Sequence, residues 1–361
     1  MECSAADVAA VRRVTKTLPL WDGHVHDADK DIHVSRLEVV SANKILVAEC
    51  HGLKVLVKFP MQNLFSMVFD LSEQKMVNDM VSQYRGDRGL NPKVLHVGTD
   101  CRVDEFVPCR TLQQSDYADM ATMEKLAVQL ATLHNDCALK EAYIAIKGGE
   151  VHTIAVRLRG MQETFQKNFP RRKANVATQV PKAHWPLARR VNDAMEILAD
   201  ACFFDDLLAK CFVVPDPAAL VFSHNDLSAN NVLKRTDMDG AVQIIDFDGS
   251  NLSYRGADIG YMIKNMEMHG MAWDPSSLAH FVDCYLAQCA ADGIVVVDKA
   301  ALMDEIARGK VLALVFLMTM FGASDNWDVF HLTGFGFLDT FPGFMETIVA
   351  FASTAAGETP A

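Results

Sequence analysis

Residues 222–248 read FSHNDLSANNVLKRTDMDGAVQIIDFD and place carboxylate and amide side chains at the ends of two short apolar stretches. The apolar stretches predict two β-strands, and the turn formers at 237–240 predict a hairpin between them. Asp226 follows the first strand, Asn231 lies five positions later, and Asp246 ends the second strand. Such a hairpin would bring the two carboxylates to one cleft.

The chemistry that needs this set of side chains is phosphoryl transfer. One carboxylate accepts the proton of the attacking hydroxyl, and a neutral oxygen together with a second carboxylate holds Mg²⁺ on the phosphates. We therefore predict Asp226 as the catalytic base, with Asn231 and Asp246 as catalytic ligands of Mg²⁺. A purely structural interpretation stays open, because Asp226 and Asn231 are also turn formers and Asp246 can cap a strand.

The first third of the chain predicts a small β-rich lobe. Arg36–Cys50 is typical of a hairpin, Leu53–Phe59 of a strand and Leu71–Tyr84 of a helix. Lys58 ends the alternating strand and suits contact with the α- and β-phosphates of a nucleotide, with Glu73 on the following helix as its partner. The alternative is a lysine that protects the edge of a sheet.

The remainder predicts a larger helical lobe. Tyr117–His134 places apolar residues with a 3.6-residue period, and most of Asp258–Ser353 is expected to be helical. The expected fold class is therefore α+β, with an N-terminal ATP-binding lobe over 1–110 and a C-terminal catalytic and substrate lobe over 111–361. The basic stretch Arg157–Arg190, which three prolines interrupt, is expected to be an irregular insertion.

Length and composition limit the function classes. The 361 residues include 34 Lys and Arg and 46 Asp and Glu, a formal charge of −12 (34 − 46), which argues against binding nucleic acid or anionic lipid through charge. The longest apolar run, Val311–Ala323, is too short to span a bilayer and is expected to be a buried helix. The N-terminus lacks the apolar core of a signal peptide, and the nine scattered cysteines suggest reduced thiols, so we expect a cytoplasmic location.

Four stretches carry a more specific resemblance. They are GLNPKVLHVGTDCRVDEFVPCRTL (89–112), HNDLSANNVL (224–233), IIDFDGSNLSYRGADIG (244–260) and FGFLDTF (335–341). In these stretches the chain resembles the choline/ethanolamine kinases of the protein-kinase-like superfamily, and YRGADIG at 254–260 is the most discriminating element. The resemblance implies a bilobal protein-kinase-like fold that uses ATP and Mg²⁺.

The resemblance also implies roles for individual residues. Asp226 matches the base that orients the substrate hydroxyl. Asn231 and Asp246 match the Mg²⁺ ligands, and Asp248 stands near the second metal ion. Arg255 and Asp258 are expected to form an internal brace. The remaining implied residues would contact either nucleotide or substrate. Those on the nucleotide side are Lys58, Ser41, Asn43, and Phe106 and Val107 of the hinge that ends at Pro108. Those on the substrate side are Ser228, Glu267, Phe321 and Phe335.

Two departures from the family pattern bear on ATP and on substrate. The family's phosphate loop is glycine-rich, whereas the loop with Ser41 and Asn43 has no glycine, so these side chains are expected to contact the phosphates. Met318 and Phe321 stand where two tryptophans are usual, and Asn265 replaces an acidic residue. A substrate pocket with so few aromatic and acidic side chains favours a primary ammonium over a trimethylammonium, since each aromatic ring would contribute about 0.5–2 kcal/mol to binding of the latter.

We therefore expect an enzyme that transfers the γ-phosphate of ATP to ethanolamine and/or choline, with ethanolamine favoured, as the first step of phosphatidylethanolamine or phosphatidylcholine synthesis. The expected partners are this small amino alcohol and, in a homodimer, a second copy of the chain; no nucleic acid and no membrane insertion are expected. Two alternatives stay open. One is a kinase of the same fold that acts on an aminoglycoside-like or other aminated substrate, and the other is a catalytically impaired pseudokinase that serves as a binding module.

Overall fold

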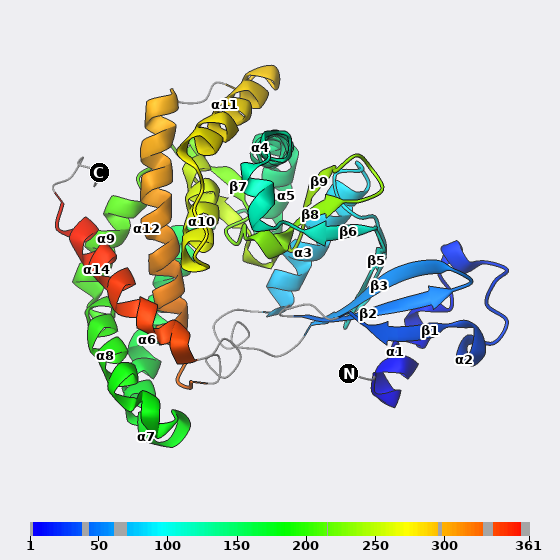
Figure 1. Ribbon diagram of the computed structural model, residues 1–361, viewed down its shortest axis with the longest axis horizontal. Coiled ribbons are helices and arrows are strands. Elements are labelled where there is room, and N and C mark those ends of the chain that lie inside the picture. Colours follow the sequence, from blue (N-terminus) through cyan, green and yellow to red (C-terminus); the bar gives the residue numbers. More distant parts are fainter. Residues whose placement is uncertain are drawn as a thin grey trace. The chain divides into compact units, whose positions relative to one another are not determined.

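The computed structural model describes residues 3–37, 43–60, 71–214, 216–294, 298–327 and 335–354. These residues form two compact units, and Figure 1 labels most of their helices and strands. Within the described ranges, the first unit comprises residues 3–60, Leu71–Arg110 and Leu233–Asp248. The second unit comprises Thr111–Val232 and the residues from Gly249 onward.

The first unit is built on a five-stranded antiparallel sheet with the strand order β1-β2-β3-β5-β4 (Figure 1). The turn between β2 and β3 consists of His51 and Gly52, with φ of 49° and 82°. Two positive φ values define the turn whose twist matches the strands of a hairpin. The bounds are β1 His33–Arg36, β2 Asn43–Cys50, β3 Leu53–Pro60, β4 Val94–Val97 and β5 Arg102–Glu105.

One face of this sheet is covered and the other is polar. Val55 and Val57 of β3 are fully buried beneath an apolar cluster that includes Val11, Trp21 and Ile32 of the N-terminal segment. That segment forms α1 Ala5–Thr15, η1 Pro19–Trp21 and α2 Ala28–Asp31.

The opposite face of the sheet gathers charged side chains. Lys58 on β3 pairs directly with Arg102 on β5, and Leu56 pairs with Asp104. Residues that face each other across antiparallel strands, and those two apart on one strand, point to the same side of the sheet. Lys58, Arg102 and Asp104 therefore share one face.

A helix, α3 Leu71–Gly86, and a three-stranded sheet complete the first unit. The sheet has the order β6-β8-β9, with β6 at Cys109–Thr111, β8 at Val232–Arg235 and β9 at Val242–Ile244. Residues 233–248, which include most of β8 and all of β9, cluster with the first unit although they follow the helices of the second unit in the sequence. Thr236 donates its backbone N–H to the Pro108 carbonyl oxygen (3.0 Å), and the Asn91 side chain donates to the Ile244 carbonyl oxygen.

The second unit is mostly helical, with one two-stranded antiparallel sheet of β7 and β10. Its longest helix, α12, packs against α10, α6, α9 and α14 (Figure 1). The helices are α4 Met120–Asn135, α5 Cys137–Ile146, α6 Ile154–Ala174, α7 Val176–Gln179, α8 Trp185–Met195, α9 Ala201–Cys211, α10 Arg255–Met268, α11 Pro275–Ala291, α12 Lys299–Ala323 and α14 Phe341–Ala352. The strands are β7 Val221–Ser223 and β10 Asn251–Ser253, and the 3₁₀ turns from Thr111 onward are η3 Gln114–Ala118, η4 Lys182–His184, η5 Glu196–Ala199, η6 Pro217–Ala219, η7 Ala229–Asn231, η8 Phe247–Gly249 and η9 Phe335–Thr340.

Helices α10 and α12 touch through their backbones. A Cβ added to Gly256 would lie 2.4 Å from the Cβ of Glu305, and one added to Gly260 would lie 2.5 Å from the carbonyl carbon of Gly309. Any side chain at these positions would push the helices apart. The glycines are therefore needed for close approach of the two helices.

Helix α12 is long and apolar enough to cross a membrane by length and composition, with a mean hydropathy of 1.6 in its most apolar window. Of that window, 78% is buried inside the structure, which is typical of the core helix of a globular domain. The predicted burial of Val311–Ala323 is confirmed.

The basic stretch Arg157–Arg190 is mostly helical, so the prediction of an irregular insertion is wrong. Helix α6 continues through Pro170, and its Leu158, Phe165 and Phe169 are buried in the main core of the second unit. Proline removes one backbone hydrogen bond within a helix, but an apolar face with a helical period stabilises the helix through packing. Packing outweighs the local helix-breaking signal here.

Candidate active site

The loop after β7 carries Asp226, and Asp258 of α10 holds its backbone. The two carboxylate oxygens of Asp258 accept the backbone N–H of His224 (2.7 Å) and of Asn225 (2.6 Å). Asn225 has a φ of 56°, which asparagine tolerates better than most residues. Asp226 therefore follows directly on a backbone that is fixed by a buried carboxylate.

Asp258 is in turn held by a chain of buried groups. His134 lies 3.0 Å from Asp258 through Nε2 and 2.8 Å from the Tyr285 hydroxyl through Nδ1, and Arg255 donates to the same hydroxyl (2.9 Å). Burial lowers the pKa of His134, so the ring is neutral and Nε2–H is the donor to Asp258. Arg255 and Asp258, which we expected to form a brace, are connected through Tyr285 and His134.

Burial by itself raises the pKa of Asp258. The hydrogen bond from His134 and the donated backbone N–H of Asn225 outweigh burial and leave this pKa below its usual value. Asp258 is therefore a buried carboxylate that stays ionised because donors surround it.

Asp226 and Asn231, which the sequence places five residues apart, meet in the structure. The amide nitrogen of Asn231 donates to the Oδ2 of Asp226 (3.0 Å) and to its carbonyl oxygen (2.7 Å). The Oδ1 of Asp226 accepts the hydroxyl of Tyr261 (2.7 Å). Because the nitrogen of Asn231 is used in this way, its amide oxygen is the atom that can coordinate a metal ion.

Gly249 lies against this carboxylate group. A Cβ on Gly249 would sit 3.0 Å from the Cβ of Asp226 and 3.1 Å from the carbonyl oxygen of His224. The carbonyl oxygen of Gly249 accepts a hydrogen bond from Arg157 of α6 (2.7 Å). The chain that follows η8 is thus fixed beside the loop of Asp226.

The first unit contains a pair of neighbouring carboxylates, Asp246 and Asp248, bridged by Asn78 of α3. The amide nitrogen of Asn78 lies 2.6 Å from the Oδ1 of Asp248 and 3.4 Å from the Oδ1 of Asp246. Burial and the negative charge of Asp246 raise the pKa of Asp248 to about 7. Asp246 itself has a φ of 68°, a conformation that costs on the order of 1–3 kcal/mol for a residue other than glycine.

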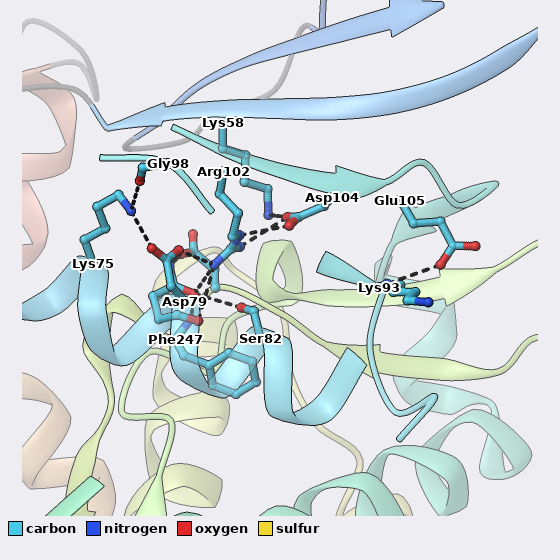
Figure 2. Close-up of polar contacts among 12 residues, drawn as sticks. Lys58, Lys75, Asp79, Ser82, Lys93, Gly98, Arg102, Asp104, Glu105 and Phe247 are labelled. Carbon is cyan, nitrogen blue, oxygen red and sulfur yellow. Dashed lines mark hydrogen bonds and ion pairs between the residues drawn. The ribbon is translucent and has the colours of Figure 1, made fainter. Parts of the chain in front are cut away.

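Lys58 belongs to a buried ionic network on the polar face of the sheet. Figure 2 shows Lys58 and Arg102 converging on Asp104, with Nζ–Oδ2 and Nε–Oδ1 distances of 2.9 Å each. Arg102 also reaches Asp79 of α3 (3.2 Å) and the Oδ1 of Asn78 (3.1 Å). The network therefore links Lys58 on β3 to the amide that bridges Asp246 and Asp248.

The structure pairs Lys58 with Asp104, a partner that the sequence prediction, which named Glu73, did not include. Asp104 is a diagonal neighbour of Lys58 across the β3–β5 pairing, so it reaches the ammonium without a contribution from α3. Burial raises the pKa of Asp104, but Lys58 and Arg102 outweigh burial and leave it below its usual value. Both cations are therefore compensated inside the unit.

The other residues expected on the nucleotide side are placed as follows. Ser41 lies outside the described residues. Asn43 is the first residue of β2 and pairs with Pro60 at the end of β3. Phe106 and Val107 lie between β5 and β6, where Val107 is buried and Phe106 is partly exposed.

The residues expected on the substrate side have different environments. Ser228 precedes η7 and donates its backbone N–H to the Asp226 carbonyl oxygen (2.8 Å). Phe321 is 4% exposed and packs against Phe341, with 5.3 Å between ring centroids. Phe335 is the first residue of η9, and its side chain lies outside the described part of the chain.

Glu267, near the end of α10, is already paired within the chain. Lys264 lies 3.1 Å from one of its carboxylate oxygens and Lys310 lies 2.6 Å from the other. Burial raises the pKa of Glu267, but the two lysines outweigh burial and lower it. Two cations around one carboxylate argue against a further role in binding an ammonium group.

Sequence reasoning missed several residues of the site, of which Tyr261, Asn78 and Asp104 make the most direct contacts. A signal existed for two of them. Tyr261 follows Asp258 by three positions in a predicted helix and so lies on the same side. Asp104 sits in a predicted strand two residues after Arg102, which is unusual for a buried strand unless the charges are paired. Asn78 carries no such signal, since a polar residue in a helix is usually exposed.

Comparison with known proteins identifies the family. The family model described as choline/ethanolamine kinase matches residues 42–273, which is more than half of the chain. A choline/ethanolamine kinase of Mus musculus is 21% identical over 199 residues, or 55% of this chain and 44% of the relative. The corresponding protein of Homo sapiens is 21% identical over 201 residues, again 44% of its length. The chain thus matches less than half the length of these relatives.

Solved structures share the fold. A choline kinase from Cryptosporidium parvum Iowa II superposes with a TM-score of 0.57 at 16% identity, over 95% of this chain and 94% of that one. A gentamicin complex of APH(2")-IIa superposes with a TM-score of 0.52 at 12% identity, over 99% and 98%. The predicted α+β, protein-kinase-like fold, with a β-sheet N-terminal part and a mostly helical rest, is confirmed. Because the family model matches more than half of this chain, the chain belongs to the choline/ethanolamine kinase family.

Proposed function

We propose that this protein transfers the γ-phosphate of ATP to the hydroxyl group of a small amino alcohol. The observation that carries the proposal is the environment of Asp226, whose carboxylate accepts a donor on each oxygen and follows a backbone that Asp258 clamps. A carboxylate held this firmly suits a base that orients the attacking hydroxyl and accepts its proton. Membership of a kinase family supports the same reaction.

In this proposal, Asn231, Asp246 and Asp248 would hold Mg²⁺. The donor set fits the ion, since it consists of oxygen atoms from two carboxylates and one amide, and Mg²⁺ takes its other ligands from phosphates and water. The raised pKa of Asp248 beside Asp246 fits as well, because two partly buried carboxylates side by side favour a cation between them. The described residues contain no group of three or more His, Cys, Asp or Glu side chains able to hold a metal ion. When bound, the ion offsets the negative charge of the phosphates.

ATP is proposed to contact residues of the first unit. Lys58 would bind the α- and β-phosphates, and its pairing with Asp104 keeps the ammonium in a defined position on the sheet. The backbone at Phe106 and Val107 would meet the adenine, and Ser41 and Asn43 would supply donors in place of a glycine-rich loop. Glu73 is left with no assigned role in this scheme.

Ethanolamine is the proposed substrate. Met318 is fully buried and Phe321 is nearly so, which supports an environment without open aromatic faces for a trimethylammonium group. A primary ammonium can instead be bound by three hydrogen bonds. Ser228 and Phe335 are kept as candidate substrate contacts, whereas the paired carboxylate Glu267 is not. A cytoplasmic location is part of the proposal, supported by nine cysteines that are all unpaired.

A coupled assay of ADP release with Mg²⁺ and ATP tests the proposal. We expect the highest kcat/KM for ethanolamine, with a stepwise fall through its N-methylated forms to choline. The variant Asp226→Ala is expected to lose about 10²–10⁴-fold in kcat while it still binds ADP. Full activity of this variant would overturn the role of Asp226, a preference for choline would overturn the substrate, and turnover of an aminoglycoside alone would identify a different substrate class.

A further inference from the structure

The carboxylate of Asp226 is held from two sides by two different elements. Asn231 of η7 donates to Oδ2 (3.0 Å), and Tyr261 of α10 donates its hydroxyl to Oδ1 (2.7 Å). The last side-chain torsion of an aspartate is broad, so a carboxylate without donors would sample many orientations. Two donors, one on each oxygen, select a single plane for the carboxylate.

We propose that Tyr261 is a positioning residue for the reaction, which sets the orientation in which Asp226 receives the substrate hydroxyl. The inference rests on the proposed function, in which Asp226 is the base. Tyr261 would act only through Asp226 and would not contact ATP. Its contribution would therefore be to kcat, because orientation matters most when the hydroxyl is aligned for attack.

The position of Tyr261 in α10 supports this role. Asp258 lies three residues earlier on the same side of the helix and clamps the backbone of His224 and Asn225. One helix thus fixes both the backbone that precedes Asp226 and the carboxylate itself. The helix is fixed in turn by the contact of Gly256 and Gly260 with α12.

The hydroxyl of Tyr261 acts as a donor throughout the physiological range. Burial and the negative charge of Asp226 raise the pKa of Tyr261 well above its usual value. The ring packs at the edge of the main apolar cluster of the second unit, so its orientation is defined by packing as well as by the hydrogen bond. Removal of the hydroxyl alone leaves that packing in place.

The test compares Tyr261→Phe with Tyr254→Phe. Tyr254 lies at the start of the same helix, is 3% exposed, and its hydroxyl has no hydrogen-bond partner among the residues that the structure describes. We expect Tyr261→Phe to lower kcat by about 10- to 100-fold with KM for ATP and for ethanolamine changed by less than about twofold. Tyr254→Phe is expected to keep both constants within about twofold, and thermal unfolding is measured for each.

The outcomes separate the inference from the proposed function. If Asp226→Ala keeps its activity, the proposed function fails whatever Tyr261 does. If Asp226→Ala is inactive and Tyr261→Phe keeps the wild-type kcat, the inference is overturned. It is also overturned if Tyr261→Phe loses kcat only together with ADP binding and thermal stability, because that result indicates a merely structural hydroxyl. A selective fall in kcat supports it.

Discussion

Replacement of Asp258 by asparagine gives the sharpest test of how the loop of Asp226 is held. The carboxylate accepts three donors, the backbone N–H of His224 and Asn225 and the Nε2–H of His134. Asparagine keeps one acceptor oxygen and presents an NH₂ group where the other oxygen was, so at least one buried donor loses its acceptor. An unpaired buried donor costs about 1–3 kcal/mol, and the remaining bonds lose their charge-assisted part.

The combined loss for Asp258→Asn is about 3–5 kcal/mol, the sum of one unpaired buried donor and two hydrogen bonds that lose their charge-assisted part. Tryptophan fluorescence in urea is the appropriate measurement, because three of the four tryptophans, at 185, 273 and 327, lie in the second unit. With a slope of about 3 kcal/mol per molar urea, the midpoint would fall by about 1–1.7 M.

Asp200→Asn is the matched control. Asp200 is exposed and accepts two backbone N–H groups, those of Cys202 (2.8 Å) and Phe203 (3.1 Å), at the start of α9. Asparagine is an equally good helix cap, so this variant is expected to change stability by less than about 0.5 kcal/mol. If the two variants differ by less than about 1 kcal/mol, the reasoning about the buried carboxylate is refuted.

Three further expectations concern packing, charge and pH. Gly260→Ala is expected to destabilise the protein by about 1–3 kcal/mol because the added Cβ meets the α12 backbone. Gly160→Ala has nothing within 4 Å of the added carbon and is expected to stabilise the protein by about 0.5–1 kcal/mol. Thermal unfolding tests whether the melting temperature falls for the first variant and rises for the second. Asp104→Asn is expected to lose about 3–5 kcal/mol in urea unfolding, whereas Asp205→Asn, in an exposed pair, is expected to lose less than about 1 kcal/mol; equal losses would contradict the buried network. Burial lowers the pKa of His134, so in acid the unfolded chain binds a proton at this residue that the folded chain does not. Stability is therefore expected to fall as the pH drops below about 6.5. A melting temperature that stays constant between about pH 7 and 5 would count against this.

Local sequence patterns predicted many of the helices and strands and the part of the site around Asp226. The contact between Asp226 and Asn231 could be predicted because the two residues lie in one short loop, where five positions of spacing leave few arrangements. The alternation of apolar and polar residues around Lys58 likewise predicted that it lies on a strand, β3. Both predictions depend on neighbours in the sequence.

Contacts that depend on the pairing of distant segments could not be predicted. The partner of Lys58 is set by the register between β3 and β5, which the sequence does not display. Pro170 predicts a break because the rule for proline is local, whereas the packing that stabilises α6 involves distant segments of the chain. The spacing from Asp258 places Tyr261 on the same side of α10, but its contact with Asp226 also requires that α10 lie beside the loop after β7, which the spacing does not reveal.

Over residues 255–261, helix α10 makes close contacts on two opposite sides. At 100° per residue, Gly256 and Gly260 face one way, toward α12, while Asp258 and Tyr261 face the other, toward the loop of Asp226. In a saturation mutagenesis scan, this segment is therefore expected to reject almost every substitution, small or large. New substrate preferences selected in the laboratory from this scaffold would then have to come from residues outside it.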